Sequence, residues 1–310
     1  MSRPRDRAAL IRQACWLEAT ARKPGNVHPN ARFADVDWND FVVSANIIAP
    51  ILARTSELGV GPAIRDAVAA TQVAVGFNTN LGIILLLAPL SAVPLGIPLR
   101  EGIGEVLNGL TQADAAATYE AIRLAKPGGL GRASAEDVAA PPTGTLREVM
   151  GLAADRDMIA AQYTTNFARV FEYADRLIGW IGREVLLSAM AEDSGSTRRL
   201  SPDIEQAIVR LHLMMLADAP DSLVARKCGL EVARDASRRA AQVLAAGWPT
   251  TARGRQDLEV FDAWLRSDGH RRNPGTTADL IAACLYVALQ SEGTDGSMAF
   301  HPPFDAAKTA

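Results

Sequence analysis

Five short polar segments interrupt an alanine-rich sequence, and each contains residue types that can bind phosphate or move a proton. The first segment, residues 23–28, contains Lys23, Gly25, Asn26 and His28 beside a proline. Glycine and proline shape a tight turn, so a cation and an imidazole could be held there toward an anion. The simpler interpretation is a helix C-cap with exposed polar side chains, and the spacing alone leaves both open.

The second segment precedes the most apolar stretch of the sequence and contains Asn78, Thr79 and Asn80. If a buried helix begins here, its free backbone N–H groups favour an anion such as phosphate. Simple N-capping by Asn78 or Thr79 would explain the same residues. The third segment, residues 126–144, is rich in glycine and proline and begins with Lys126. A loop of this kind can cradle phosphate, although it matches no P-loop and could be a surface loop.

The fourth segment places Asp221 a short distance before Arg226 and Lys227. These charges could share a binding site or form solvated pairs on a helix surface. The fifth segment, residues 270–279, is the most specific of the five. Helix capping alone explains its threonines but not the whole cluster, which comprises Arg272, Asn273, Gly275, Thr276, Thr277 and Asp279.

Several classes of function are disfavoured. The sequence has 32 Lys and Arg against 35 Asp and Glu, so it lacks the basic excess of most nucleic-acid-binding proteins. It contains no HExxH motif, no paired-cysteine zinc site and no GxSxG elbow, and His212 lies within an apolar pattern typical of a core. The three cysteines are far apart and no signal peptide is evident, so we expect a reducing, cytoplasmic location.

The elements that would position these segments are helices. Alanine favours helices, aromatic residues are only 5% of the sequence, and no alternating strand pattern occurs. We therefore predict an all-α fold, a single multi-helix domain of roughly ten or more helices over residues 1–290, followed by a loosely held tail over 291–310. Asp6, Asp37 and Thr145 are predicted N-caps, one continuous pattern runs from 145 to about 190, and another from about 222 to 246.

Two further helices matter for the site. The uncharged stretch at 81–99 contains Pro89, Pro94 and Pro98, which favours a buried core helix followed by a loop over a membrane span. Thr276 or Thr277 is expected to cap the last helix. Asp279 would then lie one turn inside that helix, where the helix dipole favours its ionised form.

Taken together, the five segments resemble one family, the triphosphoribosyl-dephospho-CoA synthases. The resemblance covers roughly residues 17–289 and rests on KPGNV at 23–27 with Asp35 and Phe41 behind it, NTNLG at 78–82, residues 221–229, and NPGTTAD at 273–279. Each motif alone is modest, but their order is fairly specific. The sequence is similar to a divergent, archaeal-type branch of the family.

The resemblance implies a glycosyl transfer in which ATP donates its triphosphoribosyl group to dephospho-CoA and adenine leaves. It implies Asp35, Asp221 and Asp279 as catalytic carboxylates, with Asp221 and Asp279 also as ligands of Mg²⁺. Phosphate contacts would come from the remaining residues of the five segments, among them Lys23, Lys227, Arg272 and Asn273. It implies no nucleic-acid or membrane partner and leaves a homo-oligomer open.

Several positions depart from the family pattern. His28 replaces an aspartate, Phe33 replaces a histidine, Asn80 and Leu81 replace a histidine and a lysine, and Lys227-Cys228 replaces Arg-Gly. A leucine or phenylalanine cannot make the contacts of a lysine or imidazole. Two alternatives therefore stay open: the same ATP-dependent transfer to a different cofactor precursor, and a helical nucleotide-binding protein without turnover.

Overall fold

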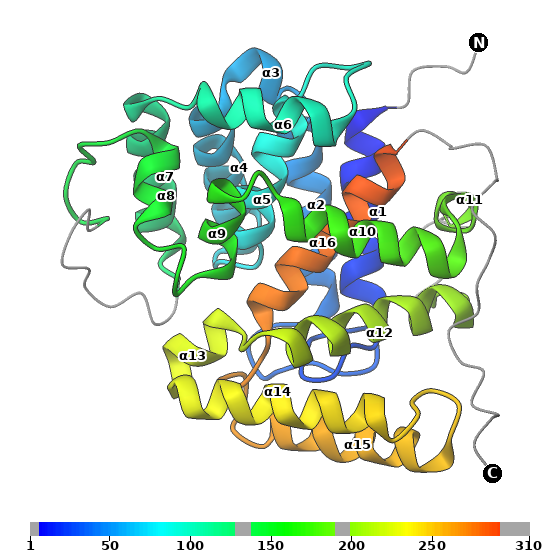
Figure 1. Ribbon diagram of the computed structural model, residues 1–310. Coiled ribbons are helices and arrows are strands. Elements are labelled where there is room, and N and C mark those ends of the chain that lie inside the picture. Colours follow the sequence, from blue (N-terminus) through cyan, green and yellow to red (C-terminus); the bar gives the residue numbers. More distant parts are fainter. Residues whose placement is uncertain (1–5, 128–137, 190–198, 292–310) are drawn as a thin grey trace.

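The computed structural model describes residues 6–127, 138–189 and 199–291, and within these ranges it consists of helices joined by loops (Figure 1). Sixteen helices are present in the described ranges, and the one extended pairing there is an isolated bridge between His28 and Ala31. The prediction of an all-α fold is confirmed. Arg132 and the tail beyond 291 lie outside the described residues, so the predicted domain boundary at 290 stays a prediction.

The helices run in the following order: α1 (Arg7–Thr20), α2 (Trp38–Leu52), α3 (Thr55–Leu58), α4 (Val60–Val75), α5 (Leu81–Ala92), α6 (Leu99–Asn108), α7 (Gln112–Ala125), α8 (Leu146–Gly151), α9 (Met158–Thr164), α10 (Ala168–Ile181), α11 (Arg183–Ser188), α12 (Pro202–Asp218), α13 (Ser222–Cys228), α14 (Leu230–Ala245), α15 (Ala252–Arg266) and α16 (Gly275–Gln290).

The core is built around α5 and α16. Every residue of α5 except Ala92 is buried, as are twelve residues of α16, so the uncharged stretch forms the predicted core helix. Helix α16 packs against α1, α5 and α10, and Figure 1 shows it inside the bundle. Within the described ranges, no helix combines the length and apolarity that crossing a membrane requires.

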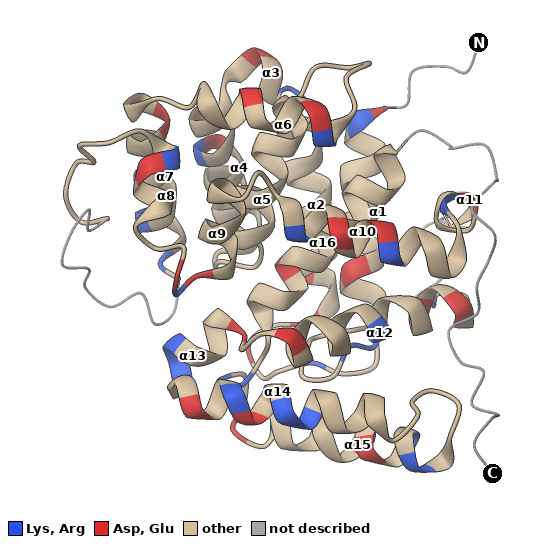
Figure 2. Ribbon diagram, viewed as in Figure 1, with Lys and Arg blue, Asp and Glu red and all other residues tan. Residues whose placement is uncertain are grey.

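A second, smaller apolar cluster joins α12, α14 and α15, which form the lower layer in Figure 1. It is centred on large side chains such as Leu213, Phe261 and Leu265. Acidic and basic residues are interspersed over the helices in Figure 2, as the near-balanced composition predicts. The charge distribution of the described helices therefore does not indicate binding to a polyanionic surface.

Local capping follows the sequence closely. Asp6 caps α1, and Asp37 and Thr145 form capping boxes at α2 and α8. The three cysteines are free, as expected.

Three predicted helix boundaries are wrong. The pattern from 145 to 190 divides into α8 to α11 at three places. Helix α8 ends before Leu152 and α9 begins after its cap Asp157, and the chain turns again at Asn166 and Phe167, with φ of 50° and 59°, and at Gly182. The pattern from 222 to 246 divides into α13 and α14 at Gly229, with φ of 91°. Helix α16 begins at Gly275 after Pro274, and no threonine caps it.

Candidate active site

A cavity of about 1210 Å³ lies among α1, α5, α7 to α10, α13 and α16. The first, second, fourth and fifth segments, which the structure describes fully, all contribute to its wall, and Lys126 of the third segment does as well. The predicted site residues that line it are Asn26, Asp35, Asn78, Thr79, Asn80, Arg226, Lys227, Asn273, Gly275, Thr276 and Asp279. These residues come from segments far apart in the sequence, and the fold brings them to the wall of one cavity.

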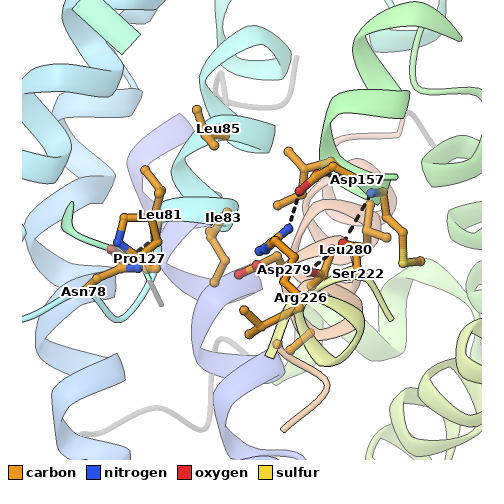
Figure 3. A pocket seen from close by; sticks show the side chains of 18 of the residues that line it. Asn78, Leu81, Ile83, Leu85, Pro127, Asp157, Ser222, Arg226, Asp279 and Leu280 are labelled. Atoms are coloured by element: carbon orange, nitrogen blue, oxygen red, sulfur yellow. Dashed lines mark hydrogen bonds and ion pairs between the residues drawn. The ribbon is translucent and has the colours of Figure 1, made fainter. Parts of the chain in front are cut away.

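The cavity has two polar ends joined by an apolar wall. In Figure 3, Asp157, Arg226 and Asp279 lie together on one side, and Asn78 lies on the other beside Leu81. Apolar side chains of α5 stand between the two groups in this view. A cavity with separated polar groups and an apolar middle can hold a ligand with a charged part and an apolar part.

Asp279 is the central carboxyl group of the cavity. Its carboxylate lies against Gly82 at the start of α5, and it has no hydrogen bond or ion pair with any described residue. Burial raises the pKa of Asp279 well above its usual value, and the charges of Glu18 and Asp221 raise it further. The expectation of an ionised carboxylate was wrong, because burial and neighbouring carboxylates outweigh the helix dipole.

Glu18 is a cavity residue that the sequence reasoning missed. It lies in the last turn of α1, is 5% exposed and lines the cavity. Its Oε1 atom is 3.0 Å from the Nζ atom of Lys23. The one signal in the sequence is an acidic residue five positions before a lysine.

The structure places Lys23 away from the cavity lining. Lys23 is fully buried, and its ammonium group also donates to the backbone carbonyl groups of Glu18 and Ala21. All three ammonium protons therefore have acceptors within the protein. The predicted contact of Lys23 with phosphate differs from this arrangement, because Lys23 pairs with Glu18 and has no exposed surface.

Asp221 is also fully buried and does not line the cavity. Its Oδ1 accepts hydrogen bonds from the backbone N–H groups of Leu223 and Val224, both at 2.9 Å. Its Oδ2 accepts from the N–H and hydroxyl of Thr277, at 2.7 and 2.8 Å. Asp221 and Thr277 thus join α13 to α16, and neither lines the cavity in which a base, metal ligand or phosphate contact is expected.

Three more predicted residues shape neighbouring loops. Gly25 has φ of 78°, and its N–H donates to Asp262 at 2.7 Å. His28 lies outside the cavity lining, and burial lowers its pKa to about 4. Arg272 donates to the backbone of Trp264 and stacks over its ring at 4.6 Å. None of these three residues lines the cavity in which their ligand contacts are expected.

Two cations of α13 do line the cavity. The guanidinium of Arg226 is 2.5 Å from Oδ2 of Asp157, whose Oδ1 caps the start of α9. Lys227 is half-buried, and this burial lowers the pKa of its ammonium group. At the rim, Asp35 is 3.3 Å from Nδ1 of His270, and both residues are exposed.

Buried amide groups add unused hydrogen-bonding capacity. Asn26 donates to Asn273 at 2.5 Å, which joins the first and fifth segments. The Oδ1 of Asn26, the Nδ2 of Asn80 and the Oε1 of Gln162 are buried without a partner among the described residues, and all three residues line the cavity. Buried polar atoms without partners are costly, so these atoms are available to a bound ligand.

Comparison with known proteins identifies the family. The model of the ATP:dephospho-CoA triphosphoribosyl transferases matches residues 4–297. The chain belongs to this family. Its members transfer the triphosphoribosyl group of ATP to dephospho-CoA, so the chain is a transferase and the cavity is its candidate active site.

A solved structure agrees with this assignment. A protein of Archaeoglobus fulgidus, provisionally named a triphosphoribosyl-dephospho-CoA synthase, superimposes with a TM-score of 0.57 and 25% sequence identity. The match covers 79% of this transferase and 96% of that chain. No curated protein matches the sequence.

Proposed function

We propose that the cavity binds ATP and an acceptor of the dephospho-CoA type together, and that the transfer takes place beside Asp279. The observation that carries this proposal is the position of Asp279. It is a carboxyl group without a described partner, inside a large cavity that also holds two cations. Displacement at the anomeric carbon of ribose needs acidic groups at the reacting atoms and cations at the phosphates.

The triphosphate belongs at the end of the cavity formed by Arg226 and Lys227. Arg226 supplies a planar group that binds phosphate oxygens in pairs, and Lys227 supplies a point charge. Gly275 and Thr276 at the start of α16 line the same cavity and lie beside α13, where the hydroxyl of Ser222 donates to that of Thr276 at 3.1 Å. The predicted contacts of Asn273 and Thr276 with substrate remain part of this proposal.

The acceptor would extend along the apolar wall toward the start of α5. Tyr119, Ile122, Val149 and Met150 line this region, and they suit the less polar arm of a dephospho-CoA-like molecule. Asn78, Thr79 and Asn80 lie at its far end, and the unpartnered Nδ2 of Asn80 offers a donor. Asp35 stands at the rim, where its exposure fits a contact with substrate better than proton transfer.

Mg²⁺ would enter with ATP. The described residues contain no group of three or more potential ligands that could hold a metal ion, and both oxygens of Asp221 are occupied. The residues present thus do not fit a metal site built by the protein alone. Mg²⁺ commonly takes most of its ligands from substrate phosphates and water.

A cytoplasmic location and a homo-oligomer also stay proposals, the first supported by three free cysteines.

Incubation with ATP, Mg²⁺ and dephospho-CoA, followed by mass analysis, tests the function. We expect free adenine and a product heavier than the acceptor by one triphosphoribosyl group. Asp279→Asn should abolish most of the release, whereas Asp175→Asn, a surface control paired with Arg100, should not. Adenine release with another acceptor alone would favour the first alternative, and ATP binding without release would favour the second.

A further inference from the structure

Two carboxyl groups of the cavity lie in opposite electrostatic surroundings. Glu18 lies beside the fully buried ammonium of Lys23, at 3.0 Å. Asp279 has no cation of its own among the described residues. Pairs of acidic groups whose surroundings favour opposite protonation states are the usual basis of an acid and a base in one active site.

Burial raises the pKa of Asp279, and so do the negative charges of Glu18 on α1, of Asp221 before α13 and of Asp157 before α9. The positive charge of Arg226 on α13 lowers this pKa, but its guanidinium is already paired with Asp157 at 2.5 Å. This arrangement favours the protonated form of Asp279, which can donate a hydrogen bond.

Glu18 has the complementary arrangement. Lys23 binds Oε1, while Oε2 has no hydrogen bond with a described residue. Because the lysine has no exposed surface and donates to two backbone carbonyl groups, it fixes the direction of the carboxylate. Glu18 can thus accept a proton inside the cavity through its free oxygen.

We infer that Asp279 donates a proton to the departing adenine, that Glu18 accepts the proton of the acceptor hydroxyl, and that Lys23 positions Glu18. This inference rests on the proposed function and adds the division of roles between two carboxyl groups. Lys23 acts only through Glu18, so it is a positioning residue.

The bond between the anomeric carbon and the adenine nitrogen breaks, its electron pair leaves with adenine, and Asp279 supplies the proton that makes adenine neutral. The acceptor oxygen forms the new bond to the anomeric carbon, and its proton passes to Glu18. Asp279 is then ionised and Glu18 neutral, and transfer of one proton from Glu18 to Asp279, directly or through water, restores both.

Two ATP donors test the role of Asp279. An 8-azaadenine base leaves more easily than adenine because its additional nitrogen stabilises the departing charge, so it needs less help from an acid. With ATP, we expect Asp279→Asn to lose about 100-fold or more in turnover. With the 8-aza donor, the loss should be several-fold smaller. An equal loss with both donors would overturn the assignment of the acid.

Three variants test Glu18 and Lys23. Glu18→Gln should lower turnover with both donors equally and leave the dissociation constant of ATP within a few-fold of wild type. Glu57→Gln, an exposed glutamate paired with Arg54, is the matched control. Since Glu18→Gln strands a buried ammonium, the double variant Glu18→Gln/Lys23→Met removes both charges and should be folded but equally inactive. Wild-type turnover in that double variant would overturn the assignment of the base.

Lys23→Met alone tests positioning through its separate effects on kcat and KM. Without the ammonium, the carboxylate of Glu18 loses the contact that fixes its direction, so kcat should fall while the KM for ATP stays within a few-fold of wild type. A lower melting temperature with unchanged kcat would show that Lys23 is merely structural. Wild-type protein that neither binds ATP nor releases adenine would instead refute the proposed function, which separates the two failures.

Discussion

The carboxylate of Asp279 lies so close to the backbone of Gly82 that a Cβ atom built on the glycine would stand 2.0 Å from Oδ2. The two residues belong to α16 and α5, the two central helices of the core. Any side chain at position 82 would displace the carboxyl group. The close approach therefore makes glycine a condition of the site, and the first prediction follows from it.

Gly82→Ala should lower adenine release by about 100-fold, because misplacing a catalytic group by roughly 1 Å costs this much. Gly179→Ala is the matched control, since a Cβ atom there meets no other atom within 4 Å. Steady-state kinetics with ATP and dephospho-CoA check the prediction. Wild-type activity in Gly82→Ala would mean that Asp279 is not a reacting group.

Asp221→Ala should lower the free energy of unfolding by about 3 kcal/mol or more, since four hydrogen bonds to a buried carboxylate are lost. Thr277→Val should lower it by less, because only its side-chain bond to Asp221 is removed. Urea denaturation of each single variant and of the double variant measures the coupling between the two residues. Unchanged stability with abolished turnover would restore the predicted catalytic role of Asp221.

Arg226→Met should weaken ATP binding by about 10-fold or more, because a charge-assisted contact with phosphate typically contributes 1.5–3 kcal/mol. The melting temperature should change little, since the ion pair with Asp157 is partly exposed. Titration calorimetry at low and high salt measures the effect, with Arg54→Met as the surface control. Equal affinities of the two variants for ATP would place the triphosphate elsewhere.

Stability should fall as the pH decreases below about 6.5. The ring of His212 is fully buried, and burial lowers its pKa to about 3, whereas the unfolded chain has a value near 6.5. Between these two values the unfolded state binds more protons, so the free energy of unfolding rises with pH across this window and falls as the pH is lowered. His28, with a pKa of about 4, contributes in the same direction.

Thermal melting of the wild type and of His212→Asn from pH 4 to 7 checks this dependence. We expect a shallower pH dependence in the variant, because one of the two titrating groups is absent. A variant as pH-sensitive as the wild type would attribute the acid sensitivity to other groups.

The amino-acid sequence alone determined the class of the fold and the order of the chemical segments. Alanine-rich helices, an uncharged core helix and caps at Asp6, Asp37 and Thr145 depend on neighbours within a few residues. Such local preferences are readable without a structure. The end of one helix and the start of the next at Gly229 could not be predicted from the sequence pattern, because apolar residues continue on both sides of the glycine.

Only the tertiary structure decided which charged residue meets which partner. Lys23 pairs with Glu18 and not with a phosphate, and the bonds from Asp221 to Thr277 connect helices 56 positions apart. Burial, together with the charges of carboxylates from other parts of the chain, raises the pKa of Asp279. Burial and the sum of distant charges control such properties, and neither can be computed from spacing along the chain.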